Sequence, residues 1–297
     1  MTRHAPDIHG TTPDGHPNRN ERKRTLTTKT KAVAVAATMA VSLGAPAAAG
    51  AVTLTGSGSS AAQPYMLELF KGYSRLHHSI HFKYVADGGN AGVKDVQAGR
   101  SEFAINTRPP LPSDSGTTQL KLFLDGLCIA VNKKNSISNI SLTSLKNVFL
   151  GVDTSWGQVG GSNLSTTIDP IGRNSAAGQY TFFQSAVLGG ATQSSNVQQD
   201  TSDGLVQVGV SHDVNSIGYL GLSHSGKPVK SIKVNGVACK ASTIRKKKYP
   251  LYRYDWGVIP TAHPNKQVEK FLVWVRSSAA AGKIINRAGA VSAFNKK

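Results

Sequence analysis

The sequence lacks the motifs that mark common hydrolases and metal sites. Its 297 residues contain no Gly-x-Ser-x-Gly elbow, no His-Glu-x-x-His motif and no convincing pair of catalytic carboxylates. His77 and His81 stand four residues apart, but the surrounding HSIHFKYV has the pattern of a strand, so we expect no metal there. These residues therefore give no sign of hydrolase chemistry or of a metal site.

Long apolar runs are also scarce. The run from Ala32 to Leu43 is too short to span a bilayer. It follows a basic cluster, Arg22–Lys31, and ends in the small residues APAAAG, which is the order of a secretory signal. We predict that residues 1–50 are a signal peptide and leader, and that the mature chain is secreted, to the periplasm or the cell surface. No cysteine stands near the predicted cleavage site, so we expect no lipid anchor.

Cysteine is rare, with only Cys128 and Cys239 in the chain. In an exported protein, two cysteines are compatible with a disulfide, and two buried thiols are the alternative. The sequence leaves both open.

Acidic residues are few: the chain has 16 Asp and Glu and 34 Lys and Arg, which gives a net charge of +18. Residues 1–49 hold 7 of the cations and 3 of the acids, so an excess of 14 positive charges belongs to the remaining chain. Such an excess favours anionic partners, including small oxyanions, acidic polymers, anionic membranes and nucleic acid, without choosing among them.

Strand-like and helix-like segments alternate after residue 51, which predicts an α/β fold. Two strand–turn–helix units deserve comparison. In the first, Val52–Thr55 leads through a Gly/Ser turn into a helix from about residue 62, and in the second the segment IGRNSAAGQYTFF carries Arg173 into a helix. Because helix N-termini attract anions and a guanidinium pairs with oxyanions, these turns predict an anion site. A surface turn with a solvated arginine is the alternative for the second segment.

Five segments carry a resemblance to a known family. In chain order they are LTGSGSSAAQPY, G-x-x-AGVKDVQAGRSEFA, SLTSLKNVFLGVDTSWGQVGG, IGRNSAAGQYTFF, and SIGYLGL with YPLYR downstream. Together they resemble the PstS-like phosphate-binding proteins that feed phosphate ABC transporters, of the type 2 periplasmic solute-binding superfamily. The resemblance implies two α/β lobes joined by a hinge, with an oxyanion held in the cleft between them. It places lobe 1 at about 51–132 plus 222–297 and lobe 2 at 133–221.

The same resemblance implies partners and a set of ligand-binding residues. The partners would be phosphate or a similar oxyanion and a membrane permease; nucleic acid is not expected, and the protein should be a monomer. Proteins of this family carry a solute, so the resemblance also implies that the chain is not an enzyme and uses neither a metal nor a cofactor. The implied oxyanion site comprises Ser59, Ser60, Ala61, Gly89, Asn90, Thr107, Arg108, Arg173, Ser175, Gly178 and Gln179.

Several of these positions depart from the family pattern. Thr107 stands where the family has an aspartate that accepts the proton of bound phosphate, and Ser175 where it often has an acidic residue bracing the arginine. Gln179 replaces a hydroxyl residue. A carboxylate that only accepts hydrogen bonds would favour a protonated anion and repel sulfate. We therefore hypothesise relaxed anion discrimination or a different ligand.

The basic run Arg245–Lys248 precedes the aromatic segment YPLYRYDW. Cations interleaved with rings can bind polyanions, but we favour a solvated turn that enters a core strand. Phosphate capture is our main functional hypothesis. One alternative is a degenerate scaffold that binds an extracellular surface or polyanion, and a weak phosphatase is the other.

Overall fold

A computed structural model describes residues 50–161 and 166–294 of the protein. The predicted signal peptide and leader lie outside the described residues, apart from Gly50.

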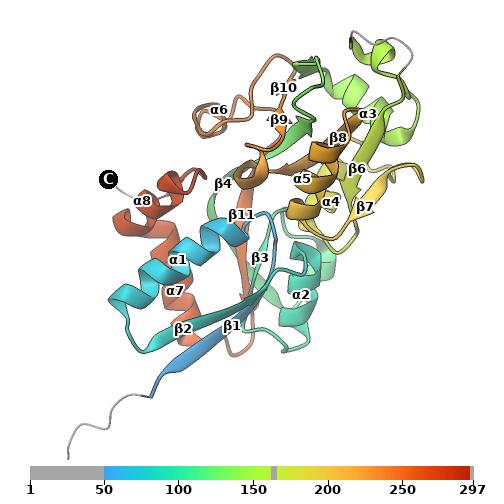
Figure 1. Cartoon of the computed structure of the whole chain (residues 1–297). Coiled ribbons are helices and arrows are strands. Elements are labelled where there is room, and N and C mark those ends of the chain that lie inside the picture. The colour runs from blue at the N-terminus through green and yellow to red at the C-terminus, as the bar shows by residue number, and fades with distance from the viewer. Residues whose placement is uncertain (1–49, 162–165, 295–297) are drawn as a thin grey trace, which may run out of the picture. The chain divides into compact units, whose positions relative to one another are not determined.

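Strands and helices alternate along most of the described chain, as an α/β protein requires (Figure 1). The strands are β1 Val52–Gly58, β2 Ile80–Val85, β3 Phe103–Asn106, β4 Thr117–Val131, β5 Asn139–Ile140, β6 Asp169–Arg173, β7 Gln198–Asp200, β8 Ser216–Gly221, β9 Lys230–Ser231, β10 Lys233–Val234 and β11 Tyr252–Pro260. The α-helices are α1 Gln63–Leu76, α2 Gly89–Gln97, α3 Leu142–Leu150, α4 Gly178–Ala186, α5 Asp203–His212, α6 Ala241–Arg245, α7 Lys266–Ser277 and α8 Ala279–Arg287. Short 3-10 helices cover Pro112–Asp114, Trp156–Val159 and Leu222–His224.

Local sequence explains where several helices begin and end. In α1 the apolar residues Tyr65, Met66, Leu69, Phe70 and Tyr73 are buried on one face, as their helical spacing predicts. Helix α3 begins after Ser141, whose hydroxyl caps the Ser144 N–H, and ends at Gly151 in the left-handed conformation. Helices α7 and α8 are separate, because Ser278 between them adopts an extended conformation and its hydroxyl caps α8.

The main sheet has the strand order β2-β1-β3-β11-β4-β8-β6-β7, and β9 pairs with β4. The strands β2, β1 and β3 are parallel, and so are β8, β6 and β7. Between these groups β11 and β4 run antiparallel to their neighbours. Strand β4 belongs to both halves: Thr117–Gly126 pair with β11, whereas Leu127–Val131 pair with β8.

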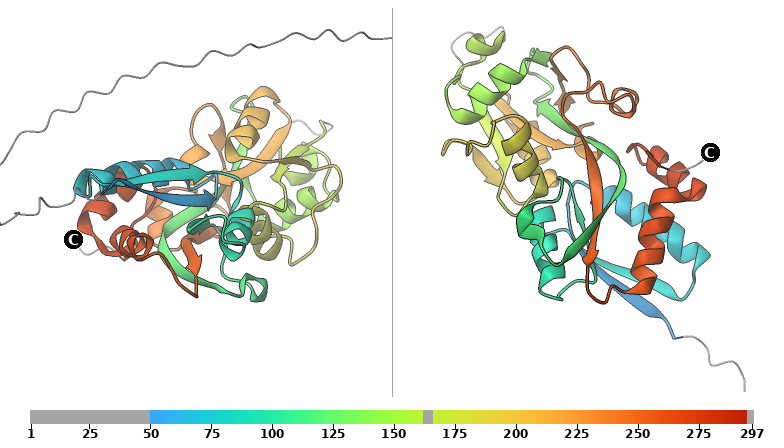
Figure 2. Two further views of the ribbon diagram at one scale, coloured as in Figure 1. Left: turned by 90° about the horizontal axis from the view of Figure 1, so that it is seen from below. Right: turned by 180° about the vertical axis from the view of Figure 1, so that it is seen from behind.

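Helices cover both halves of this sheet. Figure 1 and the right panel of Figure 2 show α1, α7 and α8 together on one side of the first half, with α2 on the other side. Two large hydrophobic clusters result, one under α1, α7 and α8 and one around α3, α4 and α5. The predicted mixed α/β, two-lobed architecture is confirmed.

The predicted lobe boundaries stay a prediction, with one observation that bears on them. Buried residues between Val229 and Leu251 belong to the cluster of the second half, although the predicted lobe 1 includes all of 222–297. We therefore propose that the chain returns to the first lobe near residue 251. Cys128 and Cys239, which both lie in that second cluster, are joined by a disulfide.

Candidate functional site

A small cavity lies where the two halves meet. Its empty volume is about 120 Å³. In this arrangement its walls stand too close together to admit a water molecule. The lining residues are Ser59, Ser60, Gly88, Gly89, Thr107, Arg173, Ala177, Gly178 and Gln179.

Three helices begin at this cavity, after strands whose carboxyl ends meet there. They are α1 after β1, α2 after β2 and α4 after β6. None of the three has a side-chain cap on its N-cap residue, and none has an acidic residue in its first turn. Such N-termini direct the positive ends of their helix dipoles toward the cavity, although two N–H groups in the first turn of α2, those of Asn90 and Ala91, are already paired with the Ala176 carbonyl. The sequence thus builds an environment for an anion from backbone groups.

Arg173 is the cation of the site, at the end of β6 and 1% exposed. Its Nη1 donates to Gln179 Oε1 at 2.7 Å and to Asp203 Oδ2. Its Nε and Nη2 donate to the carbonyls of Asp200 and Thr201 at 3.1 and 2.8 Å. These bonds use four of its five N–H groups, so one Nη2 N–H is left for a ligand. Gln179, predicted as a ligand contact, therefore also orients the arginine.

Asp203, at the start of α5, is the principal residue of the site that the sequence did not reveal. Its carboxylate also accepts hydrogen bonds from Ser60 Oγ at 3.0 Å, Gln179 Nε2 at 2.9 Å and Gly221 N at 2.7 Å. Burial by itself favours the protonated acid, but the charges of Arg173 and His224 and these hydrogen bonds lower the pKa of Asp203 below its ordinary value. Asp203 and Arg173 therefore form a buried ion pair at neutral pH.

Arg108 does not line the cavity, although it was predicted to bind the anion. Its Nη1 and Nη2 donate to the two carboxylate oxygens of Asp114 at 2.7 and 2.8 Å. Its Nε donates to Asn90 Oδ1 at 2.6 Å. The guanidinium thus fixes the turn Pro109–Asp114 and the amide of Asn90. A sequence motif cannot show this, because either role needs the same residue type.

Asn90 joins the two halves instead of lining the cavity. The N–H groups of Asn90 and Ala91 donate to the Ala176 carbonyl at 2.9 and 3.2 Å, and Asn90 Nδ2 donates to the carbonyls of Ser175 and Ala177 and to Thr181 Oγ1. On the opposite side Ser223 Oγ donates to the Ala61 carbonyl at 2.9 Å. The predicted residues Ala61 and Ser175 therefore contribute carbonyls to closure and do not line the cavity.

Two glycines allow this close approach. Gly88 has a φ of 111°, and a side chain there would overlap the Ala176 carbonyl. A Cβ on Gly178 would overlap Asn106 Oδ1 and lie 2.9 Å from Thr107 Oγ1. The halves therefore meet closely only because both positions lack side chains.

Thr107 has the one lining side-chain oxygen that is buried without a hydrogen-bond partner among the described residues. Thr107 is 0% exposed, and buried hydroxyls normally find a partner. Its neighbour Asn106 likewise leaves Nδ2 unpaired. These two groups indicate that an additional polar molecule belongs at this point.

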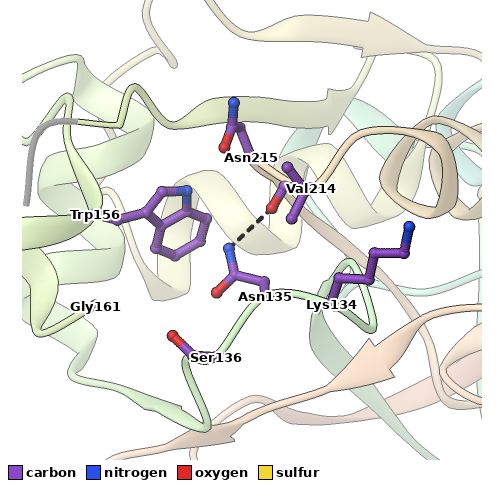
Figure 3. A pocket seen from close by; sticks show the side chains of 7 residues that line it. All are labelled: Lys134, Asn135, Ser136, Trp156, Gly161, Val214 and Asn215. Carbon is purple, nitrogen blue, oxygen red and sulfur yellow. Dashed lines mark hydrogen bonds between the residues drawn. The ribbon is translucent and has the colours of Figure 1, made fainter. Parts of the chain in front are cut away.

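A second cavity lies at the opposite end of the second half (Figure 3). Its walls include Trp156, Asn215 and Asn135, whose Nδ2 donates to the Val214 carbonyl at 3.0 Å. Asn215 directly precedes β8, whereas Arg173 ends β6, and these strands are parallel. Since open α/β sheets bind ligands at the carboxyl ends of their strands, the first cavity is the candidate site.

Within 50–161 and 166–294, no cluster of three or more His, Cys, Asp or Glu side chains is placed to hold a metal ion. Over the same residues, no helix is long and apolar enough to cross a bilayer.

The profile of the PBP superfamily domain matches residues 44–279. The chain belongs to the PBP superfamily. Among curated relatives, it is 23% identical over 245 residues to the phosphate-binding protein PstS of Bacillus subtilis (strain 168), covering 80% of each chain. It is 25% identical over 256 residues to PstS of Staphylococcus aureus (strain RF122), covering 80% of this chain and 77% of that one. The predicted resemblance to PstS-like proteins is confirmed.

Solved structures share the PBP fold. A putative phosphate ABC transporter substrate-binding protein from Clostridium perfringens, solved with bound phosphate, aligns with a TM-score of 0.76 at 21% identity and covers 82% of this chain and 100% of its own. An ABC-type phosphate transport receptor from Vibrio cholerae aligns with a TM-score of 0.66 at 24% identity, covering 80% and 99%. At these identities the likeness establishes the architecture.

Proposed function

We propose that this PBP-superfamily protein captures phosphate or a related tetrahedral oxyanion between its two lobes and delivers it to an ABC transporter. The observation that carries the proposal is the convergence of three uncapped helix N-termini and Arg173 on one small cavity. Relatives named as phosphate-binding proteins support the choice of ligand. We further propose that the chain acts as an exported monomer and catalyses no reaction.

The chemical groups that line the cavity favour the binding of an anion. Side-chain donors available to a ligand are one Nη2 N–H of Arg173, the second Nε2 N–H of Gln179, and the hydroxyls of Thr107 and Ser59, the latter of which only accepts a hydrogen bond from the Ala62 N–H. No carboxylate lines the cavity. Because Arg173 is already paired with Asp203, the attraction for an anion comes mainly from hydrogen bonds and helix dipoles rather than from net charge.

Capture requires the lobes to separate. The cavity has no room for a water molecule, and the contacts of Asn90 and Ser223 close it on two sides. We propose that an anion reaches the site when these contacts break and that β4 and β11, which lie between the two groups of parallel strands, bend to allow it. Closure of the lobes around the anion would bring the same lining residues together, with the walls far enough apart to hold it.

Thr107→Val gives the sharpest test of this proposal. The substitution keeps the shape of the side chain and removes a hydroxyl that has no partner in the unliganded chain. Since a hydrogen bond to a charged ligand contributes about 1.5–3 kcal/mol, we expect phosphate affinity, measured by isothermal titration calorimetry, to fall by roughly 10- to 150-fold. The urea midpoint without anion should stay the same or rise.

Thr118→Val is the matched control, because Thr118 is exposed and contacts only Thr261 through its hydroxyl. It should leave anion affinity unchanged. Unaltered phosphate affinity in Thr107→Val would remove the cavity as the binding site. If the unsubstituted protein binds neither phosphate nor sulfate, oxyanion capture itself is excluded.

The donor-rich lining also bears on selectivity. No carboxylate on the cavity wall can accept a proton from the ligand, and Asp203 behind the wall is already paired with Arg173, so the cavity has little to repel a fully ionised anion. We propose that phosphate and sulfate bind with affinities within about tenfold of each other. Thr107→Asp should then reduce sulfate affinity far more than phosphate affinity. A strong preference for phosphate in the unsubstituted protein would contradict the proposed lack of discrimination while leaving phosphate capture intact.

A further inference from the structure

The positive charge of the protein is confined to one part of the chain. Residues 50–225 contain 11 Lys and Arg and 11 Asp and Glu, and thus carry no net charge. Residues 226–297 contain 16 Lys and Arg against only Asp255 and Glu269. Asp255 is fully buried. The whole excess of 14 charges in the mature chain therefore lies in this last quarter, and the anion cavity, built from residues 59–179, does not account for it.

The structure gathers part of this charge around an aromatic cluster on β11. Lys121 Nζ lies 4.8 Å from the ring centroid of Tyr254 and 5.2 Å from that of Trp256. Lys247 Nζ lies 5.8 Å from the Tyr254 ring. Tyr254 in turn stacks on Phe294, at 5.9 Å, and the Arg276 guanidinium lies 4.4 Å from the Phe294 ring. The cations thus come from three separate segments and share one surface.

Helix α6 connects this cluster to α8. Arg245 Nη2 donates to Asn286 Oδ1 at 3.0 Å, which places Arg245, the first residue of the exposed run Arg245–Lys248, at the last turn of α8, where Arg287 follows Asn286. Arg287 lines a groove between α1 and α8 whose other wall carries Arg75. Figure 1 and the right panel of Figure 2 show α6, α7 and α8, in orange to red, along one side of the protein. We call Lys121, Arg245–Lys248, Arg276 and Arg287 the basic face.

We infer that the basic face binds a linear polyanion, a chain with closely spaced sulfate, phosphate or carboxylate groups. Its cations are spread over several elements, which suits a partner whose charges repeat along its length. The rings of Tyr254 and Phe294 are covered by the protein's own cations, so they offer no free platform on which bases could stack. Among the large exposed hydrophobic residues of the described chain, Val273 of α7 is the one that comes from the elements carrying the basic face, so these elements offer little apolar surface for insertion into a bilayer.

The test uses heparin fragments of one length as the sulfated probe and poly-L-glutamate as the carboxylated one, with affinity measured between 0.05 and 0.5 M salt. The variant is Lys246→Gln, Lys247→Gln, Lys248→Gln, because these exposed side chains are not needed for packing. Each ionic contact steepens the slope of log affinity against log salt by about 0.7–0.9. In the variant, the slope of log affinity against log salt should therefore be shallower by about 2, and the affinity at 0.15 M salt should be about 100-fold lower.

The control variant, Lys94→Gln, Lys133→Gln, Lys134→Gln, removes the same number of positive charges. Its three lysines are exposed and lie outside the basic face. It should keep nearly full affinity, and both variants should bind phosphate as the unsubstituted protein does. Equal losses in the two variants would show that only net charge matters and would overturn the inference. Binding to vesicles with anionic lipids but not to heparin would overturn it too, and so would tighter binding of single-stranded nucleic acid than of heparin.

Discussion

A double-mutant cycle on Arg173 and Asp203 would test the buried pair at the centre of the candidate site. The two side chains are 2% and 0% exposed. Arg173→Met removes the guanidinium, and Asp203→Asn removes the negative charge with little change of shape. Each single substitution leaves an uncompensated buried partner, which costs about 3–5 kcal/mol. The double substitution leaves no buried charge, so we expect its loss to be smaller than the sum by about 2–3 kcal/mol.

Urea unfolding followed by tryptophan fluorescence would measure the four free energies of unfolding, provided that the slope with urea stays the same. In a domain of this size a loss of 4 kcal/mol should lower Tm by roughly 8–16 °C. The exposed pair Lys71 and Glu68 is the control, with both side chains more than half exposed, and its cycle should show no measurable coupling. Additive losses for Arg173 and Asp203 would refute the pairing.

The Arg173–Asp203 pair also predicts how the stability of the protein changes with pH. Because the folded-state pKa of Asp203 is lowered, its stabilisation is complete above the unfolded pKa near 4 and is lost as the pH falls through the lower folded value. Asp203→Asn should therefore flatten the acid limb of the stability curve below about pH 4. An acid limb as steep as in the unsubstituted protein would show that other carboxylates dominate it.

Three further predictions follow from the same structure. Burial and the neighbouring Asp95 raise the pKa of Asp87 to about 6, so stability should fall as the pH rises from 4 through 6, and Asp87→Asn should remove that fall in a urea titration at several pH values. Gly178→Ala should obstruct closure at Asn106 and weaken phosphate binding at least tenfold by calorimetry, with an unchanged fold by circular dichroism; full affinity would show that the halves need not meet there. Replacing Cys128 and Cys239 with serine opens a loop of 111 residues and should lower the free energy of unfolding by about 2–5 kcal/mol, whereas no change would mean that the native chain holds two thiols.

Much of the fold and part of the site follow from local patterns. The apolar spacing of α1, the strand before Arg173 and the glycine turns each predict an element from a few neighbouring residues, and all three are found where expected. Strands that end in small or polar residues meet at one edge of a sheet, so Ser59, Thr107 and Arg173 line one cavity. That they bind an oxyanion there stays a prediction.

What the sequence could not show are pairings between distant residues of common types. Asp203 lies 30 positions after Arg173 and sits in a polar segment that resembles any solvated helix start. Arg108 pairs with Asp114, six residues away, and does not reach the cavity. Nothing in the motif around Arg108 distinguishes these two arrangements. Conversely, a hydroxyl or an amide serves equally well for ligand binding and for closure, as Asn90 illustrates.

Strand β4 has a practical consequence for anyone who wishes to dissect this protein. Its first ten residues pair with β11 in one half of the main sheet, and its last five pair with β8 in the other half. A cut elsewhere in the strand than directly after residue 126 therefore leaves one piece with an unsatisfied edge. We expect that neither lobe can be produced as a soluble fragment by itself. Co-expressed halves should recover a folded protein only when each retains its own share of this strand.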